Sequence, residues 1–192
     1  MPDEPDGSQF SAKSRSSRIP PILGSAVFLL LAPGTIAGLV PWLVSHWRMQ
    51  PPLLAFAPFR ALGSVLIVAG LLVLLESFAR FALRGLGTPA PVFPTRHLVV
   101  SGLYRYVRNP MYVAVLCINL GQGLLLGNHN VLIYAAIVWL AMHLFVVSYE
   151  EPTLRRRYGA EFDIFCRNVP RWMPRLTPWR VVSGSADPSR IP

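Results

Sequence analysis

This chain has few charged residues, almost no lysine and little cysteine. Only 14% of its 192 residues are charged, whereas about 25% is typical of a soluble globular domain. The 18 basic residues outnumber the 9 acidic ones, and Lys13 is the one lysine among them. Cys117 and Cys166 are too few for a disulfide scaffold. The scarcity of charge also argues against a disordered chain or a nucleic-acid-binding arm, despite the net charge of +9.

The chain contains long apolar runs without charged residues. Residues 19–47 contain no Asp, Glu, Lys or Arg, and a membrane-spanning helix needs about 20 apolar residues. We therefore expect a first span over roughly Ile22–Ser45, which is too long for the apolar region of a secretory signal peptide. Another span is expected over about Arg60–Leu83, where Glu76 interrupts the apolar pattern.

A second uncharged run covers residues 109–149 and is about twice the length of one span. The polar, turn-forming residues 127–130, Gly-Asn-His-Asn, divide it into a helical hairpin. The expected spans are Pro110–Leu126 and Val131–Tyr149. The predicted fold class is an all-α integral membrane protein with about four transmembrane helices, because apolar runs of this length are typical of membrane spans.

The arginines predict how these spans are oriented. With four spans, both termini lie on one side of the membrane, together with all 18 basic residues except Arg48 and Arg60. Basic residues accumulate on the cytoplasmic side, so we expect the termini, the central loop and the active site there. The excess of arginine over lysine favours a bacterial source, and hence the inner membrane. Anionic lipid head groups then explain the positive charge without nucleic acid.

Composition divides the chain into four predicted parts. Residues 1–18 form a polar, disordered leader, and residues 19–83 form an N-terminal pair of spans. Residues 84–180 form a catalytic region of loop, hairpin and cytoplasmic tail, and residues 181–192 form a disordered end. After Tyr149, apolar side chains fall at helical spacing beside basic ones, which predicts an amphipathic helix on the membrane face.

Polar side chains within spans often have a function, because they cost free energy at membrane depth. Glu76 has Arg80 four residues later, so a structural ion pair is an open alternative. Asn119 and Gln122 lie one turn apart and either join helices by hydrogen bonds or line a site. His143 lies two turns before an acidic pair, and either faces the same cavity or is only hydrogen-bonded.

Two segments combine polar residues in a way that favours a binding site. Glu150 and Glu151 end the predicted fourth span, where Pro152 is expected to break the helix. Carboxylates there meet the negative end of the helix dipole, so a bound cation or an arginine would stabilise them.

The segment from Tyr104 to Tyr112 places two arginines and three tyrosines beside a helix start, where an anionic group is favoured. Its Asn-Pro pair also fits a plain helix start.

Taken together, these features resemble one family, the isoprenylcysteine carboxyl methyltransferases, which are grouped with the phospholipid N-methyltransferases. The similar segments are Leu98–Tyr112, the helical hairpin after it, Glu150-Glu151, Tyr158-Gly159 and Val169-Pro170-Arg171. The similarity covers roughly residues 85–174, and its motifs are specific in combination. It implies an integral membrane methyltransferase that uses S-adenosylmethionine on a hydrophobic, isoprenoid or lipid-like acceptor.

The resemblance also implies roles for individual residues. The positions that correspond to cofactor contacts in that family are Arg96, His97, Leu98, Val99, Tyr104, Asn109, Pro110, Met111, Tyr112 and Glu150. Arg108 and Glu151 are the expected catalytic residues, with Arg108 or Arg105 binding the methionine carboxylate or the anionic end of the substrate. The segment Gly85-Leu86-Gly87 resembles the Gly-x-Gly of the phospholipid enzymes.

Two positions depart from the family pattern. Asn109 stands where the eukaryotic enzymes have histidine; it can donate a hydrogen bond but does not titrate near neutral pH. Val146 stands where the prenylcysteine enzymes carry an arginine that addresses the substrate carboxylate. The residues that match the cofactor-binding part of the family pattern are therefore present. The chemical class of the methyl acceptor stays open, and the candidates are a carboxylate, an amine and a thiol.

Methyl transfer from a sulfonium depends mainly on alignment of donor and acceptor. A carboxylate acceptor needs no base, whereas an amine must first lose a proton, for which Glu151 and His143 are the candidates. Two other classes stay open, a membrane reductase that uses NADPH and a non-catalytic membrane scaffold. The four histidines lack ligand spacing with cysteine or acid, so no metal site is expected. The sequence does not specify an oligomeric state.

Overall fold

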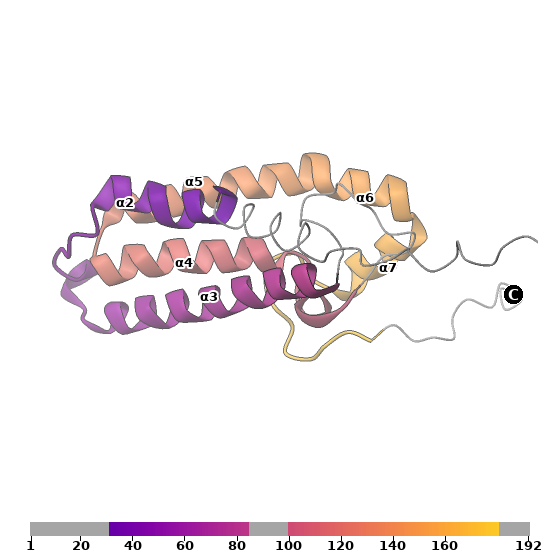
Figure 1. The fold of residues 1–192 in the computed structure, drawn as a ribbon, viewed down its shortest axis with the longest axis horizontal. Coiled ribbons are helices and arrows are strands. Elements are labelled where there is room, and N and C mark those ends of the chain that lie inside the picture. The colour runs from indigo at the N-terminus through magenta and orange to yellow at the C-terminus, as the bar shows by residue number, and fades with distance from the viewer. Residues whose placement is uncertain (1–30, 85–99, 181–192) are drawn as a thin grey trace, which may run out of the picture.

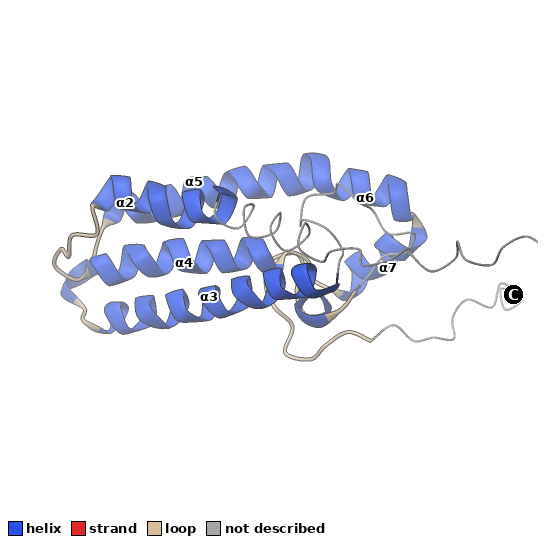
Figure 2. Cartoon of the chain, viewed as in Figure 1, coloured by secondary structure: helices blue, strands red, loops and turns tan. Residues whose placement is uncertain are grey.

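The computed structural model describes residues 31–84 and 100–180, and every regular element in these ranges is a helix (Figures 1 and 2). The expected all-α class is confirmed for these ranges. The α-helices are α2 (Val40–Ser45), α3 (Pro58–Arg84), α4 (Pro110–Leu126), α5 (His129–Phe145), α6 (Glu151–Tyr158) and α7 (Ala160–Asn168). The expected leader, residues 1–18, and the expected disordered end, residues 181–192, lie outside the described residues.

Helix α4 lies at the centre of a bundle, with α3 on one side and α2 and α5 on the other (Figure 1). Four short elements connect or interrupt the α-helices. They are the π-helical turns η2 (Thr35–Leu39) and η5 (Val146–Glu150) and the 3-10 turns η3 (Leu53–Ala55) and η4 (Gly102–Arg105).

Glycines bring α3 and α4 into close contact. A Cβ added to Gly63 would lie 2.6 Å from the backbone nitrogen of Leu125, and one added to Gly121 would lie 2.6 Å from the carbonyl oxygen of Gly63. Two turns along α3, a Cβ on Gly70 would lie 2.7 Å from the carbonyl oxygen of Ala114. No side chain fits at these points, so the helices pack backbone to backbone, as small residues allow membrane helices to do.

Polar side chains of α4 join it to its neighbours. Gln122 Nε2 donates to the carbonyl oxygen of Ala37 at 2.6 Å, and Gln122 Oε1 accepts from the indole of Trp47 at 3.2 Å. Asn119 Nδ2 donates to the carbonyl of Val115 in its own helix at 2.9 Å. Gln122 therefore joins helices by hydrogen bonds. This is the first of the two roles that the sequence left open for it, the other being to line a site.

The turn of the α4–α5 hairpin falls where its residues predict it. Helix α4 has the expected bounds, Pro110–Leu126, and ends at Gly127, which adopts φ of 67°. Asn128 caps α5 by accepting hydrogen bonds from the backbone of Asn130 and Val131. A left-handed glycine followed by an Asn cap is a local signal for a helix end and a helix start, so the expected turn is confirmed.

The expected helix break at Pro152 is wrong. Helix α5 passes through η5 directly into α6, and Pro152 lies within the first two positions of α6. A proline lacks an N–H and normally collides with the carbonyl four residues earlier. In η5 the hydrogen bonds span five residues, since the N–H of Glu151 bonds to the carbonyl of Val146. This wide turn displaces the carbonyl ladder and accommodates the proline ring.

The tail after α5 forms two short helices where one amphipathic helix is expected. The break falls at Gly159, which has φ of 51°. The apolar side of this segment does not face outward, because Phe162, Phe165 and Val169 are buried together, with Leu154 packed against them. The tail therefore has a small core of its own.

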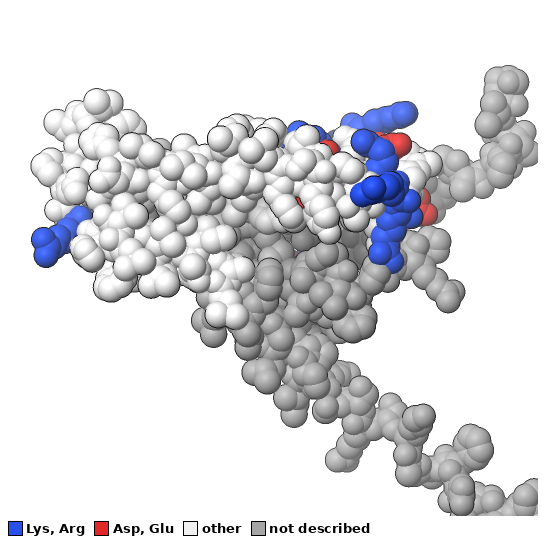
Figure 3. Space-filling view, turned by 90° about the horizontal axis from the view of Figure 1, so that it is seen from above, with Lys and Arg blue, Asp and Glu red and all other residues white. Residues whose placement is uncertain are grey.

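The long sides of the bundle are apolar and most of its charge lies at one end. Pro58–Arg80 and His129–Tyr158 are long and apolar enough to cross a membrane, and Leu31–Ser45 and Pro110–Leu126 are apolar but shorter. The exposed apolar side chains on α3 and α5 include Val65, Val68, Leu72, Leu75, Ile133, Ile137, Leu140 and Leu144. In Figure 3 most of the charged groups gather over α6 and α7, one basic group lies at the opposite end, and most of the visible bundle surface is uncharged. Apolar sides with a charged end are typical of a membrane protein.

Candidate functional site

Most of the predicted site residues lie at the charged end of the bundle, where η4 leads into α4 and α5 passes into α6. After α7 the chain runs back along this junction as residues 169–180, which we call the return segment. Backbone hydrogen bonds of 2.9 Å hold it in place. They run from Arg108 N to Pro170 O, from Arg175 N to Tyr106 O and from Trp179 N to Arg105 O.

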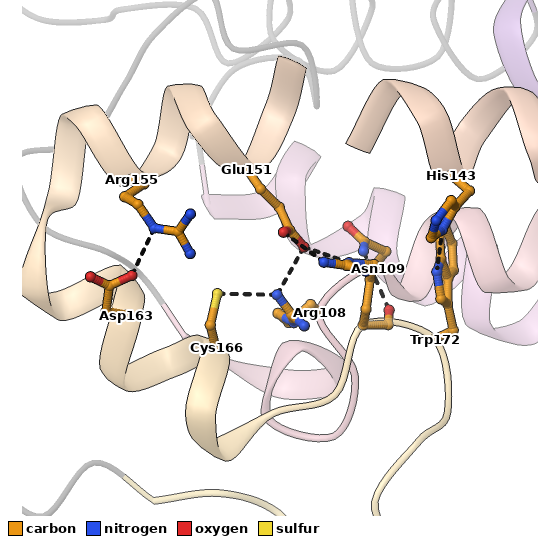
Figure 4. A network of polar contacts seen from close by, with 9 residues as sticks. Arg108, Asn109, His143, Glu151, Arg155, Asp163, Cys166 and Trp172 are labelled. Atoms are coloured by element: carbon orange, nitrogen blue, oxygen red, sulfur yellow. Dashed lines mark hydrogen bonds and ion pairs between the residues drawn. The ribbon is translucent and has the colours of Figure 1, made fainter. Parts of the chain in front are cut away.

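Arg108, just before α4, forms an ion-pair network with Glu151 of α6 and Arg171 of the return segment. Figure 4 labels Arg108 and Glu151 of this network. Arg108 Nη1 donates to Glu151 Oε1 at 2.8 Å. Arg171 donates from Nε to Glu151 Oε1 at 2.7 Å and from Nη2 to Glu151 Oε2 at 2.8 Å. The Glu151 side chain is only 11% exposed, so one carboxylate with little access to solvent is shared by two guanidinium groups. Its hydrogen bond to Arg171 raises the pKa of that arginine further.

Two neutral groups complete this network. Arg108 Nη1 also donates to the sulfur of Cys166 in α7 at 3.1 Å. Burial raises the pKa of the Cys166 thiol, and the charge of Arg108 opposes that rise. Asn109 Nδ2 donates to the carbonyl oxygen of Arg171 at 3.3 Å and makes no side-chain cap bond to α4. Asn109 therefore fixes the return segment rather than capping the helix.

Glu150 has a different partner from its neighbour. The hydroxyl of Tyr112, in the first turn of α4, donates to Glu150 Oε2 at 3.2 Å. Tyr104 in η4 lies close to this pair, and its pKa is raised by burial first and then by the negative charges of Glu150 and Glu76. Two phenols and a carboxylate thus gather at the α4–η5 crossing.

His143 lies between two indoles, one turn before η5. Its ring stacks on Trp139 with centroids 5.4 Å apart, and Trp172 Nε1 donates to His143 Nδ1 at 3.2 Å (Figure 4). An indole N–H can only donate, so Nδ1 is the acceptor and any proton of the neutral ring is on Nε2. His143 anchors the return segment to α5.

The remaining predicted residues take up varied positions. Pro110 is buried at the start of α4, and Met111 packs against the core between α3 and α4. The predicted contacts Arg96, His97, Leu98 and Val99 lie outside the described residues. Arg171 and Trp172 were not among the predicted site residues. The Val169-Pro170-Arg171 motif is a signal for the arginine, but nothing in it identifies Glu151 as the partner.

No group of three or more His, Cys, Asp or Glu side chains that would hold a metal ion occurs in the stretches 31–84 and 100–180. The ion pairs at this end of the bundle include Arg108–Glu151, Arg171–Glu151 and Arg155–Asp163.

Comparison with known proteins identifies the family. Residues 59–161 match the family described as phospholipid methyltransferase, which is more than half of the 192 residues. The chain therefore belongs to the phospholipid methyltransferase family, and the resemblance to the isoprenylcysteine methyltransferase group is confirmed. Over 80 residues it is 32% identical to Protein-S-isoprenylcysteine O-methyltransferase of Schizosaccharomyces pombe. This match covers 41% of the chain and 34% of the yeast protein, so it spans about a third of that relative's length.

Proposed function

We propose that this chain is an integral membrane methyltransferase that transfers a methyl group from S-adenosylmethionine to a hydrophobic, lipid-like acceptor. The observation that carries the proposal is the Tyr112–Glu150 hydrogen bond, beside Tyr104 and inside the family-matched region. A carboxylate with aromatic rings near it attracts a positively charged group. The methyl donor carries two such groups, a sulfonium and an ammonium.

The residues present fit this cofactor. Glu150 uses Oε2 for Tyr112, which leaves Oε1 for a cationic group. The Nε of Arg108 is buried without a hydrogen-bond partner among the described residues, and it suits a carboxylate. When bound, S-adenosylmethionine supplies an electrophilic methyl group on its sulfur. Asn109, Pro110 and Met111 lie on the same turn of chain, and with Arg96–Val99 they remain the predicted further contacts.

We assign Glu151 the task of positioning Arg108. Both Glu151 oxygens accept hydrogen bonds from guanidinium groups, which stabilises the charged carboxylate and makes it a poor base. The same bonds hold Arg108 in one orientation at the start of α4. Arg108 then binds an anionic end, either that of the cofactor or that of the substrate.

The acceptor that this geometry favours is a carboxylate. The two candidate bases for an amine acceptor are Glu151, which is held by two arginines, and His143, whose Nδ1 accepts from Trp172. Neither has a free basic atom in this arrangement. A carboxylate attacks the methyl group without losing a proton first, and a dry site assists because charge is neutralised during transfer.

We further propose four transmembrane spans. Helix α3 and the continuous helix His129–Tyr158, which consists of α5, η5 and α6, each have the length to cross, and α4 must carry the chain back between them. Its 17 residues span about 25 Å, close to the hydrocarbon thickness of about 30 Å. The basic tail then lies in the cytoplasm of a bacterial cell. Residues 19–83 serve as the N-terminal pair of spans and residues 84–180 as the catalytic region, which a lipid substrate reaches from the side.

The first experiment is equilibrium binding of S-adenosylmethionine to the detergent-purified chain, with NADPH alongside and Glu150→Gln as the control. We expect S-adenosylmethionine to bind and the variant to lose that binding. Preference for NADPH would instead indicate the reductase class, and absence of binding by a folded chain would indicate the scaffold class.

The second experiment tests the acceptor. Transfer of labelled methyl is measured to a farnesylated cysteine carboxylate and to a phosphatidylethanolamine, each in mixed micelles. Labelling of the carboxylate supports the proposal. Labelling of the amine alone would show that a base operates in the site.

A further inference from the structure

Glu76 and Arg80 of α3 are charged residues that the proposed function has not used. Arg80 Nε donates to Glu76 Oε1, so the expected ion pair is present. The second carboxylate oxygen, Glu76 Oε2, is buried and has no hydrogen-bond partner among the described residues. A buried charged oxygen without a donor costs free energy, so the pairing with Arg80 does not by itself account for Glu76.

Arg80 connects this pair to the candidate site. Gly102, the first residue of η4, adopts φ of 59°, and a Cβ added to it would lie 2.7 Å from Arg80 Cζ. The guanidinium of Arg80 is therefore packed directly on the turn that carries Tyr104. Glycine is favoured there because the residue adopts a left-handed backbone conformation.

Tyr104 then lies near carboxylates from two separate elements. The negative charges of Glu150 in η5 and Glu76 in α3 both act on its phenol, and the hydroxyl of Tyr112 donates to Glu150 Oε2. Four chain segments thus place two carboxylates and two aromatic rings together. Aromatic faces combined with carboxylates form the environment that recognises organic cations.

Resting on the proposed function, we infer that Glu76 is a second carboxylate of the cofactor site, which binds one of the two positive groups of the methyl donor. Arg80 positions Glu76 and holds η4 against α3. The charges then match, since the donor has two cationic groups and one carboxylate, and the site has Glu76, Glu150 and Arg108. This pairing also satisfies the buried oxygen of Glu76.

The test compares three related nucleosides that differ in the charged groups they carry. S-adenosylmethionine carries a sulfonium and an ammonium, S-adenosylhomocysteine keeps the ammonium alone, and 5′-methylthioadenosine has neither. We expect Glu76→Gln to weaken S-adenosylmethionine binding about tenfold, as loss of one charged hydrogen bond does, and to leave methylthioadenosine binding unchanged. If Glu76→Gln weakens the binding of both S-adenosylmethionine and S-adenosylhomocysteine, Glu76 binds the ammonium. If it weakens the binding of S-adenosylmethionine but not of S-adenosylhomocysteine, Glu76 binds the sulfonium.

Two further variants separate charge recognition from structural damage. Asp163→Asn removes a carboxylate at the same end of the bundle, from an exposed pair with Arg155, and should leave all three affinities unchanged. Arg80→Gln keeps the charge of Glu76 but removes the residue that positions it, so it should weaken S-adenosylmethionine binding less than Glu76→Gln does and leave methylthioadenosine binding unchanged. Equal weakening of all three ligands by Glu76→Gln, or none, would overturn the inference. Failure of the wild-type chain to bind any of them would overturn the proposed function instead.

Discussion

Arg171 binds Glu151 through two parallel hydrogen bonds, Nε to Oε1 at 2.7 Å and Nη2 to Oε2 at 2.8 Å. The residues are 20 positions apart, and the contact joins the return segment to the first turn of α6. The planar guanidinium fork matches a carboxylate in a way that lysine cannot. Because Glu151 also binds Arg108, the same contact reaches the start of α4.

This relationship predicts a graded loss of stability. Glu151→Gln leaves two arginines without their counter-ion and should cost about 2–3 kcal/mol, whereas Arg171→Lys keeps the charge, loses the fork and should cost about 1 kcal/mol. Thermal unfolding in detergent measures both. Asp163→Asn is the matched control, because its pair with Arg155 is exposed and should change little. Equal stability of wild type and Glu151→Gln would show that the network is not structural.

The Tyr112–Glu150 hydrogen bond predicts unequal effects on cofactor affinity. Glu150→Gln removes the charge that attracts a cation and should weaken S-adenosylmethionine binding at least a hundredfold. Tyr112→Phe removes only the hydroxyl that orients the carboxylate and should weaken binding about fivefold, as loss of one neutral hydrogen bond does. Isothermal titration calorimetry distinguishes the two. Near-normal affinity of Glu150→Gln would remove Glu150 from the site.

The contact between α3 and α4 predicts that one glycine tolerates alanine and another does not. A Cβ on Gly121 would lie 2.6 Å from the backbone of Gly63, whereas nothing lies within 4 Å of a Cβ on Gly38. Gly121→Ala should therefore destabilise the bundle by about 2 kcal/mol through overpacking, and Gly38→Ala should not. Both variants are compared by thermal unfolding in detergent. Equal effects would mean that the close approach of α3 and α4 is not required.

Burial of the Cys166 thiol predicts an unusual pH dependence of its alkylation. Only the thiolate reacts, and burial raises the pKa of this thiol, so less thiolate is present at neutral pH than for a free cysteine. In a Cys117→Ser background, the iodoacetamide rate should rise with a midpoint above about 8.5, the value of free cysteine. Arg108→Gln removes a charge that favours the thiolate and should move the midpoint higher. A midpoint below that of free cysteine would contradict the partly buried position of Cys166.

Local signals in the sequence predict much of the fold. The α4–α5 turn was predictable because Gly127 and Asn128 act on their own neighbours, as a left-handed helix end and a helix cap. The continuation of the helix through Pro152 was not predictable, because it depends on a π-turn whose register is set by packing over several turns. The tail helix was expected as one piece because helical spacing continues across Gly159, which ends α6.

The site was predictable to a lesser extent. Glu150 and Glu151 look equivalent in the sequence, yet one bonds to Tyr112 and the other to Arg108 and Arg171. Successive helix residues point about 100° apart, and their partners come from segments whose positions only the fold determines. Pairing between distant segments, unlike a cap or a turn, leaves no local pattern.

The four-span proposal predicts that the two ends of the bundle lie on opposite sides of the membrane. Met49, in the loop before α3, and Arg156, in α6, are both exposed. In a background with Cys117→Ser and Cys166→Ser, we expect a thiol introduced by Met49→Cys to react with an impermeant maleimide in right-side-out bacterial spheroplasts. A thiol introduced by Arg156→Cys should react only in inverted vesicles, because the positive-inside rule places the arginine-rich end in the cytoplasm. Labelling of both thiols from one side would rule out four spans, since α4 would then return without crossing the bilayer.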